Sequence, residues 1–309
     1  MSTLDDHPFA LALTHDVDRV RKTYQALYYA MTRRDPGSLL DLLPGRSPYW
    51  QFQTVMDIES DLGVRSAFYF LDERSLFGER PPREWLDPTS WRLYAGRYDL
   101  AEREITDTVV ELDEGGWEIG LHGSYDSYRN PDQLRREKRR LERILGHPVM
   151  GGRQHYLNLK RPDTWKYQAA AGLRYDSSLG SSSEYGFDGR YEPFRPFDDE
   201  FVVFPLTVME KTLPAVESDP ERAWAVCEDL LQEARENAAV MTVLWHPSYF
   251  YDRDHPNYGT IYRRLIERAL EMGAWVGPPG EIYRSLDHPT TRAGWTESES
   301  LIDDARGGV

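Results

Sequence analysis

Short apolar runs rich in β-branched residues alternate with helix-forming segments along most of this chain, and this alternation limits its possible folds more than any other feature. Strands that alternate with helices form βα units around a parallel sheet. Eight runs are predicted to be strands: 9–17, 65–71, 117–122, 149–153, 173–176, 201–206, 240–246 and 275–277. Since about eight parallel strands can close a barrel, the sequence predicts an α/β fold with a barrel-like sheet.

Two segments are longer than a minimal barrel needs. Residues 22–50 and 72–97 follow the first and second predicted strands, at the end of the sheet where barrel active sites are built. We therefore expect one barrel domain over residues 1–288 with loop insertions on the active-site side. The polar, acidic tail over residues 289–309 is expected to be flexible.

Composition narrows the class of protein. A chain of 309 residues can bury a core without disulfides, and the lone Cys227 favours a reducing compartment. The chain has 37 basic and 52 acidic residues. The resulting net charge of −15 argues against a dedicated binder of nucleic acid or of anionic membranes. No apolar run approaches the ~18 residues of a membrane span, and the first residues lack the pattern of a signal peptide. We expect a soluble, cytoplasmic protein.

The first predicted strand ends in a group of polar residues, Thr14-His15-Asp16-Val17-Asp18. Because side chains alternate along a strand, Asp16 and Asp18 share one face while His15 takes the other. Two carboxylates on one face repel each other unless a cation or a proton separates them, so this end predicts a hard-metal or general-base site. The alternative is that both carboxylates only cap the following turn.

Later strands also end in ionisable side chains. His122 ends the third strand, and Asp126 follows four positions later in a glycine-containing turn, so the two could join Asp18 around one ion. Alone, His122 could equally be a hydrogen-bonded histidine at the rim. His246 ends an apolar strand on the same face as Leu244, which suits a general acid beside an apolar wall.

The order of these strand ends resembles the polysaccharide deacetylase superfamily, of the carbohydrate esterase family 4 type. The matching segments are Thr14-His15-Asp16-Val17-Asp18, His122-Gly123-Ser124-Tyr125-Asp126, Arg153 with Tyr156, Asp176, and Leu244-Trp245-His246. The likeness covers roughly residues 8–285. It implies a distorted (β/α) barrel of about seven strands. It also implies hydrolysis of N-acetyl groups on amino sugars with one divalent metal ion, usually Zn²⁺.

The resemblance also implies roles for individual residues. Asp16 would be the catalytic base and His246 the general acid, with Arg153 orienting Asp16 and Asp176 orienting His246. The metal ligands would be Asp18, His122 and Asp126. Substrate contacts would come from the Tyr156 backbone N–H, which would help to bind the oxyanion, from Leu244, which would line the acetyl-methyl pocket, and from Trp245, which could stack on a sugar ring.

Asp126 departs from the family pattern, because the metal motif usually has a second histidine at its position. With Asp18 and Asp126 together the ligands would carry −2 and neutralise a divalent ion, which would then acidify its water less. The sequence therefore predicts a slower enzyme, a metal preference that extends to Mn²⁺ or Mg²⁺, or lost catalysis.

The expected substrate is an acetylated amino sugar or a nucleotide-linked or lipid-linked precursor of a surface polysaccharide, met inside the cell. One alternative keeps the barrel and the metal but hydrolyses another C–N bond, as in a cyclic amide of the allantoin type. Another is a non-catalytic, glycan-binding family member. A binder needs no base, acid and orienting groups together, so the presence of Asp16, Arg153, Asp176 and His246 favours an enzyme.

Overall fold

A computed structural model describes residues 6–43, 45–73, 76–79, 81–94 and 96–286 of the chain. The strands are β1 (Ala10–Val17), β2 (Ala67–Leu71), β3 (Glu118–Gly123), β4 (Gly151–Gln154), β5 (Tyr175–Asp176), β6 (Val202–Val203), β7 (Leu206–Met209), β8 (Val240–Leu244) and β9 (Trp275–Gly277). They form one parallel sheet in the order β6-β5-β4-β3-β2-β1-β8-β7, and β9 pairs with β1. The sheet curls into a distorted (β/α) barrel, which confirms the predicted fold class.

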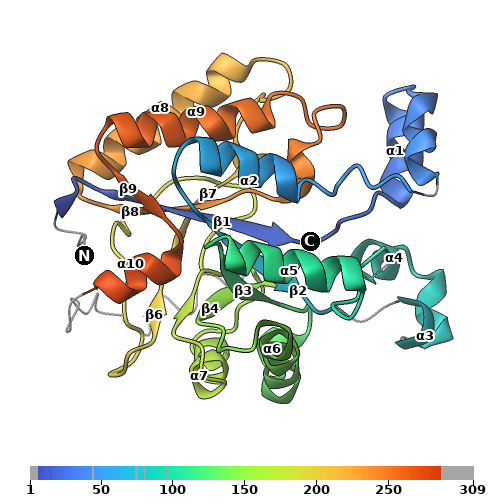
Figure 1. The fold of residues 1–309 in the computed structure, drawn as a ribbon, viewed down its shortest axis with the longest axis horizontal. Helices are drawn as coiled ribbons and strands as arrows, with labels where there is room; N and C mark the ends of the chain where they lie inside the picture. Colours follow the sequence, from blue (N-terminus) through green and yellow to red (C-terminus); the bar gives the residue numbers. More distant parts are fainter. Residues whose placement is uncertain (1–5, 44, 74–75, 80, 95, 287–309) are drawn as a thin grey trace.

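Helices surround this sheet. The α-helices are α1 (Tyr24–Thr32), α2 (Phe52–Asp61), α3 (Leu76–Glu79), α4 (Pro88–Tyr94), α5 (Arg103–Glu114), α6 (Pro131–Leu145), α7 (Asp163–Ala170), α8 (Pro220–Glu236), α9 (Tyr258–Glu271) and α10 (Pro279–Ser285). The 3₁₀ turns are η2 (Pro36–Leu42), η3 (Pro82–Leu86), η4 (Ser127–Arg129), η5 (His155–Leu157), η6 (Glu210–Thr212) and η7 (Pro247–Phe250). In Figure 1, α2, α8 and α9 lie above β1, whereas α5, α6 and α7 lie below it. No helix in the described part of the chain is long and apolar enough to cross a membrane.

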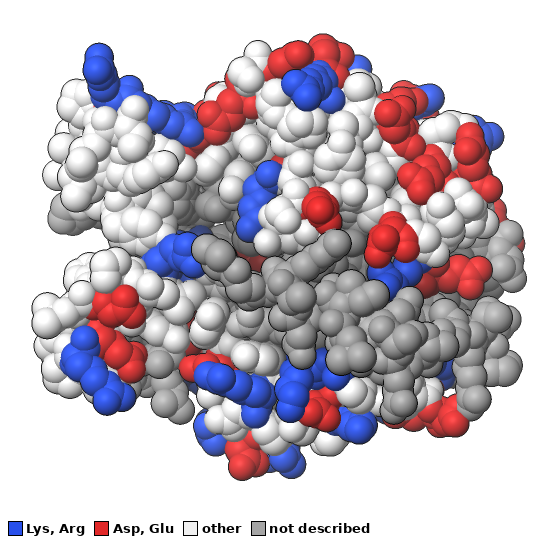
Figure 2. All heavy atoms as spheres, turned by 180° about the vertical axis from the view of Figure 1, so that it is seen from behind, with Lys and Arg blue, Asp and Glu red and all other residues white. Residues whose placement is uncertain are grey.

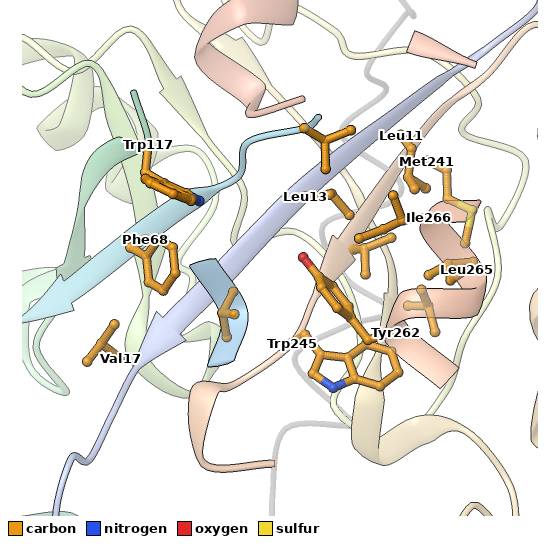
Figure 3. Close-up of a cluster of buried hydrophobic side chains, with 14 of the residues drawn as sticks. Leu11, Leu13, Val17, Phe68, Trp117, Met241, Trp245, Tyr262, Leu265 and Ile266 are labelled. Carbon is orange, nitrogen blue, oxygen red and sulfur yellow. The ribbon is translucent and has the colours of Figure 1, made fainter. Parts of the chain in front are cut away.

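Strand β1 lies at the centre of the sheet, where it pairs with β8, β9 and β2. Its side chains alternate between two apolar clusters, as the strand period requires. Ala10 and Ala12 point into the barrel, whereas Leu11 and Leu13 join the larger cluster beneath the helices, which Figure 3 shows in part. The same alternation continues into the polar residues at the carboxyl end of β1, so it decides which of them face the barrel interior.

The amino-terminal end of the barrel is filled. Ile282 of α10 packs into the interior cluster, and the Gly280 N–H donates to Glu118 Oε2 at 2.8 Å. Tyr69 belongs to the same interior cluster. It lies so close to Gly120 that a Cβ on this glycine would be 2.3 Å from the Tyr69 ring. A functional site therefore has to lie at the opposite end, where the strands finish.

Seven of the eight predicted strands are found with ends within two residues of those expected. Helix α6 begins after Asn130, whose side chain accepts from the Gln133 N–H, and it ends at Gly146 with φ 78°. The predicted strand 201–206 is wrong in extent, because the chain forms two strands, β6 and β7, on either side of Phe204 and Pro205. Proline lacks the N–H that a continuous ladder needs. Because β7 begins only after Pro205, it extends to Met209, beyond the predicted end at residue 206.

The two insertions take the expected places. Residues 22–50 follow β1 and contain α1 and η2, and the segment after β2 contains α3, η3 and α4. Both extend to the right of Figure 1, at the end of the barrel where β1 finishes. The polar tail expected over residues 289–309 lies outside the described residues.

Candidate metal centre and active site

Three side chains from three strand ends converge at the carboxyl end of the barrel. Asp18 follows β1, His122 lies in β3 and His155 follows β4. Asp18 Oδ1 lies 3.1 Å from His122 Nε2 and 3.4 Å from His155 Nε2. One ligand atom of each residue lies within 4.8 Å of the others, which is the spacing of ligands that share one ion.

Both histidines are held with Nε2 toward Asp18. His122 Nδ1 lies 3.0 Å from the Arg153 carbonyl oxygen, which can only accept, so the proton is on Nδ1. Arg97 Nη2 lies 3.2 Å from His155 Nε2, and because a guanidinium can only donate, this Nε2 is an acceptor. Each imidazole therefore offers its Nε2 lone pair, which is the form that binds a metal.

These residues fit a divalent ion. Burial raises the pKa of Asp18, but the neighbouring His155 and His122 outweigh this effect and hold the pKa well below its usual value. A metal binds its ligands in their deprotonated form, so with an ion bound the Asp18 carboxylate and two neutral imidazoles would carry −1, and a divalent ion would keep a net +1. Three protein ligands with room for more are typical of catalytic rather than structural zinc sites.

Asp16 is held beside this group as an ionised carboxylate. Arg153 Nη1 donates to Asp16 Oδ1 at 2.7 Å, and both side chains are buried. The other oxygen, Oδ2, lies 3.8 Å from His122 Nε2. Burial alone would raise the pKa of Asp16, yet Arg153 and His122 lower it below the usual value. The geometry agrees with the orienting role expected of Arg153.

His246 also lies beside Asp18, with Nε2 3.9 Å from Asp18 Oδ2. Its Nδ1 lies 2.9 Å from Oε1 of the buried Glu210, and its backbone N–H donates to Glu210 Oε2 at 3.3 Å. Burial lowers the pKa of His246, but the Glu210 charge and hydrogen bond outweigh it and raise the pKa to about 9. The imidazole is therefore held in its protonated form, ready to donate from Nε2.

Asp126 was expected to be a metal ligand, but the structure does not bring it into the group. Its Oδ1 accepts from Arg129 Nη2 at 2.6 Å at the start of η4. His155 takes the third position instead. This corrects the expected ligand charge from −2 to −1, and it removes the reason to predict a weakly acidifying metal.

Asp176 does not orient His246. Its buried carboxylate accepts from Trp165 Nε1 at 3.1 Å and from Gln168 Nε2 at 2.7 Å. It also accepts from Ser178, whose Oγ in turn accepts from the Gln154 N–H at 2.8 Å. The expectation is corrected because β5 is separated from β8 by four strands of the sheet. Asp176 instead supports the end of β4, from which Arg153 and His155 project.

The three expected substrate contacts differ in exposure. Tyr156 is 44% exposed and has a left-handed backbone with φ 60°, whereas Leu244 is buried with Leu206 and Met209. Trp245 is fully buried and packs against Tyr262 in the cluster of Figure 3, with ring centroids 5.4 Å apart and the rings tilted by 51°. The expected stacking of Trp245 on a sugar is therefore corrected, because its side chain points away from the barrel mouth.

Two residues of this site, His155 and Glu210, were not predicted. Strand alternation alone could have found His155, because it lies two positions after Arg153 and so shares its face. Glu210 was hidden by the misplaced strand boundary at Pro205. Once β7 is known to end at Met209, the next residue is a strand-end carboxylate.

Arg97, at the base of the second insertion, also reaches the site. Its Nη1 donates to the Asp18 carbonyl oxygen at 2.7 Å, and its Nε donates to the Leu93 carbonyl oxygen at 2.8 Å. The insertion after β2 is therefore tied to the turn that carries the carboxylate of the candidate metal centre.

Neither a protein-family model nor a curated protein sequence matches this chain. Solved structures do match it in fold. One from Mycobacterium smegmatis, assigned as a polysaccharide deacetylase, has a TM-score of 0.61 at 17% identity and covers 96% of both chains. Puue allantoinase has a TM-score of 0.57 at 14% identity, covering 92% of this chain and 93% of its own. The chitin deacetylase of the fungus Colletotrichum lindemuthianum has a TM-score of 0.50 at 13% identity, covering 94% and 97%.

These identities are low, so the likeness establishes architecture rather than activity. It agrees with the parallel, curled sheet and with a site at its carboxyl end. The chain has the fold of the polysaccharide deacetylases.

Proposed function

We propose that this protein is a metal-dependent hydrolase that removes an N-acetyl group from an amino sugar or a surface-polysaccharide precursor. The observation that carries the proposal is that a low-pKa carboxylate, Asp16, and a high-pKa imidazole, His246, both lie beside the candidate metal centre. Asp16 Oδ2 is 3.8 Å from His122 Nε2, and His246 Nε2 is 3.9 Å from Asp18 Oδ2. Paired groups whose surroundings push their pKa values apart are typical of a base and an acid in one reaction.

Asp18, His122 and His155 would hold the ion, for which we propose Zn²⁺ because two histidines and one carboxylate are a common catalytic zinc set. When bound, a divalent ion polarises the scissile carbonyl and lowers the pKa of water. Asp16 accepts the proton of the attacking water, and Arg153 keeps this carboxylate ionised and aimed. His246 donates a proton from Nε2 to the departing amine, while Glu210 holds its Nδ1.

Metal content separates the proposed ligands from their neighbours. His155→Ala should reduce the bound zinc measured by elemental analysis at least about 10-fold, because it removes one of three ligands. Asp126→Ala is the matched control, a carboxylate removed close by, and should leave the metal content unchanged. Loss of metal in the Asp126 variant with retention in the His155 variant would overturn this ligand set.

The reaction is tested by acetate release from a panel of acetylated amino sugars, both free and linked to a nucleotide or a lipid. Cyclic ureides such as allantoin belong in the same panel, because an allantoinase shares the fold. Turnover of the ureide alone would replace the deacetylase proposal. A metal-loaded protein without turnover on any member would favour a glycan-binding role.

A further inference from the structure

An unusual apolar surface covers the two insertions. Twelve of the fifteen large apolar side chains that are exposed in the described residues belong to the segments 24–43 and 77–91. Single exposed apolar residues are ordinary, but a concentration of this kind indicates an interaction surface.

Helix α1 presents a continuous apolar stripe to solvent. Tyr24, Leu27, Tyr28 and Met31 have the spacing i, i+3, i+4, i+7 of one helix face, and they are 39%, 56%, 58% and 71% exposed. Amphipathic helices of globular proteins normally turn such a face toward the core. This helix turns it outward.

The turn η2 and the residue after it extend this surface. Leu39, Leu40, Leu42 and Leu43 are between 42% and 51% exposed. We call these four leucines and the four stripe residues of α1 the apolar face. On the neighbouring insertion Phe77, Trp85, Leu86 and Trp91 are also exposed, and Leu86 reaches 88%.

Buried ion pairs attach the inner side of the first insertion to the barrel. The apolar stripe therefore faces outward on a segment that is anchored to the rest of the fold. The buried Lys22 Nζ donates to Asp41 Oδ2 at 2.9 Å and to Asp254 Oδ1 at 2.8 Å. Arg33 adds a bond from Nη1 to the Asp254 carbonyl oxygen at 2.6 Å. Lys22 and Asp254 thus join the start of α1 to the loop after β8, and the apolar face takes no part in this anchor.

The charge of the first insertion is opposite to that of the molecule. Residues 19–50 contain six lysine and arginine residues and only two acidic ones, within a chain whose net charge is −15. Arg34 and Arg46 are exposed near the ends of the apolar face. Arg21, Lys22 and Arg33 form ion pairs with carboxylates, most of them outside the insertion. The exposed Arg34 and Arg46 therefore supply the charge for a docked partner, within the Debye length of about 8 Å at physiological salt.

The two insertions form the projecting edge of the molecule. In Figure 2, where α1 and the α3–α4 segment lie on the left, two projections flank an indentation. The upper one is largely uncharged with basic side chains extending from it, and the lower one also carries acidic and basic side chains. Arg19 Nη2 donates to the Arg92 carbonyl oxygen and so links the bases of the two segments. Both segments follow strands that end at the same edge of the sheet as the candidate metal centre, and Asp18 of that centre follows the first of these strands.

We infer that the apolar face docks on the surface of a phospholipid bilayer, with the leucine, tyrosine and methionine side chains entering the headgroup region and the arginines contacting lipid phosphates. Aromatic and aliphatic residues flanked by arginine are the composition of interfacial helices. A second copy of the same face would bring two positively charged insertions together. The inference is independent of the reaction proposed above.

Flotation of the purified full-length protein with lipid vesicles tests this inference. Binding is expected to vesicles of phosphatidylcholine mixed with phosphatidylglycerol, and it should weaken in about 1 M salt, where the Debye length is about 3 Å. Leu27→Ser/Met31→Ser should reduce the bound fraction about 10-fold or more, because both side chains lie on the outward stripe. Arg34→Gln/Arg46→Gln should reduce it on phosphatidylglycerol vesicles.

Leu270→Ser is the matched control, since Leu270 is 37% exposed on α9 outside both insertions. It should bind vesicles as the parent does. The inference is overturned if the parent does not bind, or if Leu270→Ser loses as much binding as the double variant. It is also overturned if light scattering shows a dimer that Leu27→Ser/Met31→Ser dissociates, because a second copy then covers the face.

Discussion

The two faces of β1 at its carboxyl end carry the same kinds of side chain but do different things. On the outer face, His15 Nδ1 lies 2.6 Å from the Trp245 carbonyl oxygen, and its Nε2 lies 2.9 Å from Glu59 Oε1. On the inner face, one residue along, Asp16 and then Asp18 point toward the barrel mouth.

The difference lies in how the polar atoms are satisfied. Glu59 also accepts from Trp117 Nε1 at 2.7 Å and from the Tyr262 hydroxyl at 2.6 Å, so on the outer face each polar atom of this network has a protein partner. On the inner face Asp18 Oδ1, His122 Nε2 and His155 Nε2 are all acceptor atoms gathered around one point. A histidine with a carboxylate stabilises the fold where donors and acceptors balance. Where acceptors are in excess, the same pair of side chains is suited to bind a cation.

The largest expected effect is on the inner face. Asp16→Asn should lower turnover about 10²-fold to 10⁴-fold, because an amide cannot accept the proton of the attacking water. Its oxygen can still accept from Arg153, so the fold should be kept. The measurement is acetate release per mole of folded protein, with circular dichroism as the control. A variant that retains turnover within threefold would remove Asp16 as the base.

A change on the outer face of β1 should lower stability and leave turnover nearly unchanged. Glu59→Gln should lower the free energy of unfolding by about 1–3 kcal/mol, because the amide NH₂ cannot accept from the donors that now share this carboxylate. Turnover per folded molecule should stay near that of the parent, and urea denaturation measures the loss. If turnover fell while stability held, the two faces would not be separable in function.

The alternation of side chains along a strand made part of the candidate site predictable from the sequence. It placed Asp16 and Asp18 on one face and His15 on the other, and these placements are confirmed by the contacts of each residue. The barrel and its insertions also follow from local pattern, because strands that alternate with helices indicate a parallel sheet covered by helices.

Side chains in turns, and contacts between strands that are distant in sequence, were not predictable in this way. Asp126 lies in a turn, where no period fixes the direction of a side chain, and a nearby arginine decides its position. Glu210 takes the role expected of Asp176, because the partner of His246 depends on which strand is its neighbour in space. Sheet order and the break at Pro205 are tertiary facts that a single sequence does not state.

Glu210 offers a finer test of the inner face. Glu210→Gln should lower the pKa of His246, since the carboxylate is what raises it to about 9. A general acid works only while protonated, so activity is lost as pH rises through its pKa. The alkaline limb of the pH–rate profile should therefore move to lower pH, with about a 10-fold loss near pH 8. An unmoved limb would mean that His246 is not the titrating acid.

The smallest effect is expected at Trp245, where the alternation of β8 assigns the side chain to the outer face. Trp245→Phe removes a buried indole N–H that has no hydrogen-bond partner among the described residues, and this removal should stabilise the fold by about 1–3 kcal/mol. The smaller ring leaves a void of similar cost. The free energy of unfolding should thus change by less than about 1 kcal/mol. KM for the acetylated sugar should be unchanged, because the ring packs near Tyr262 and not in the barrel mouth. A raised KM with unchanged stability would instead place Trp245 against the substrate and break the division between the two faces.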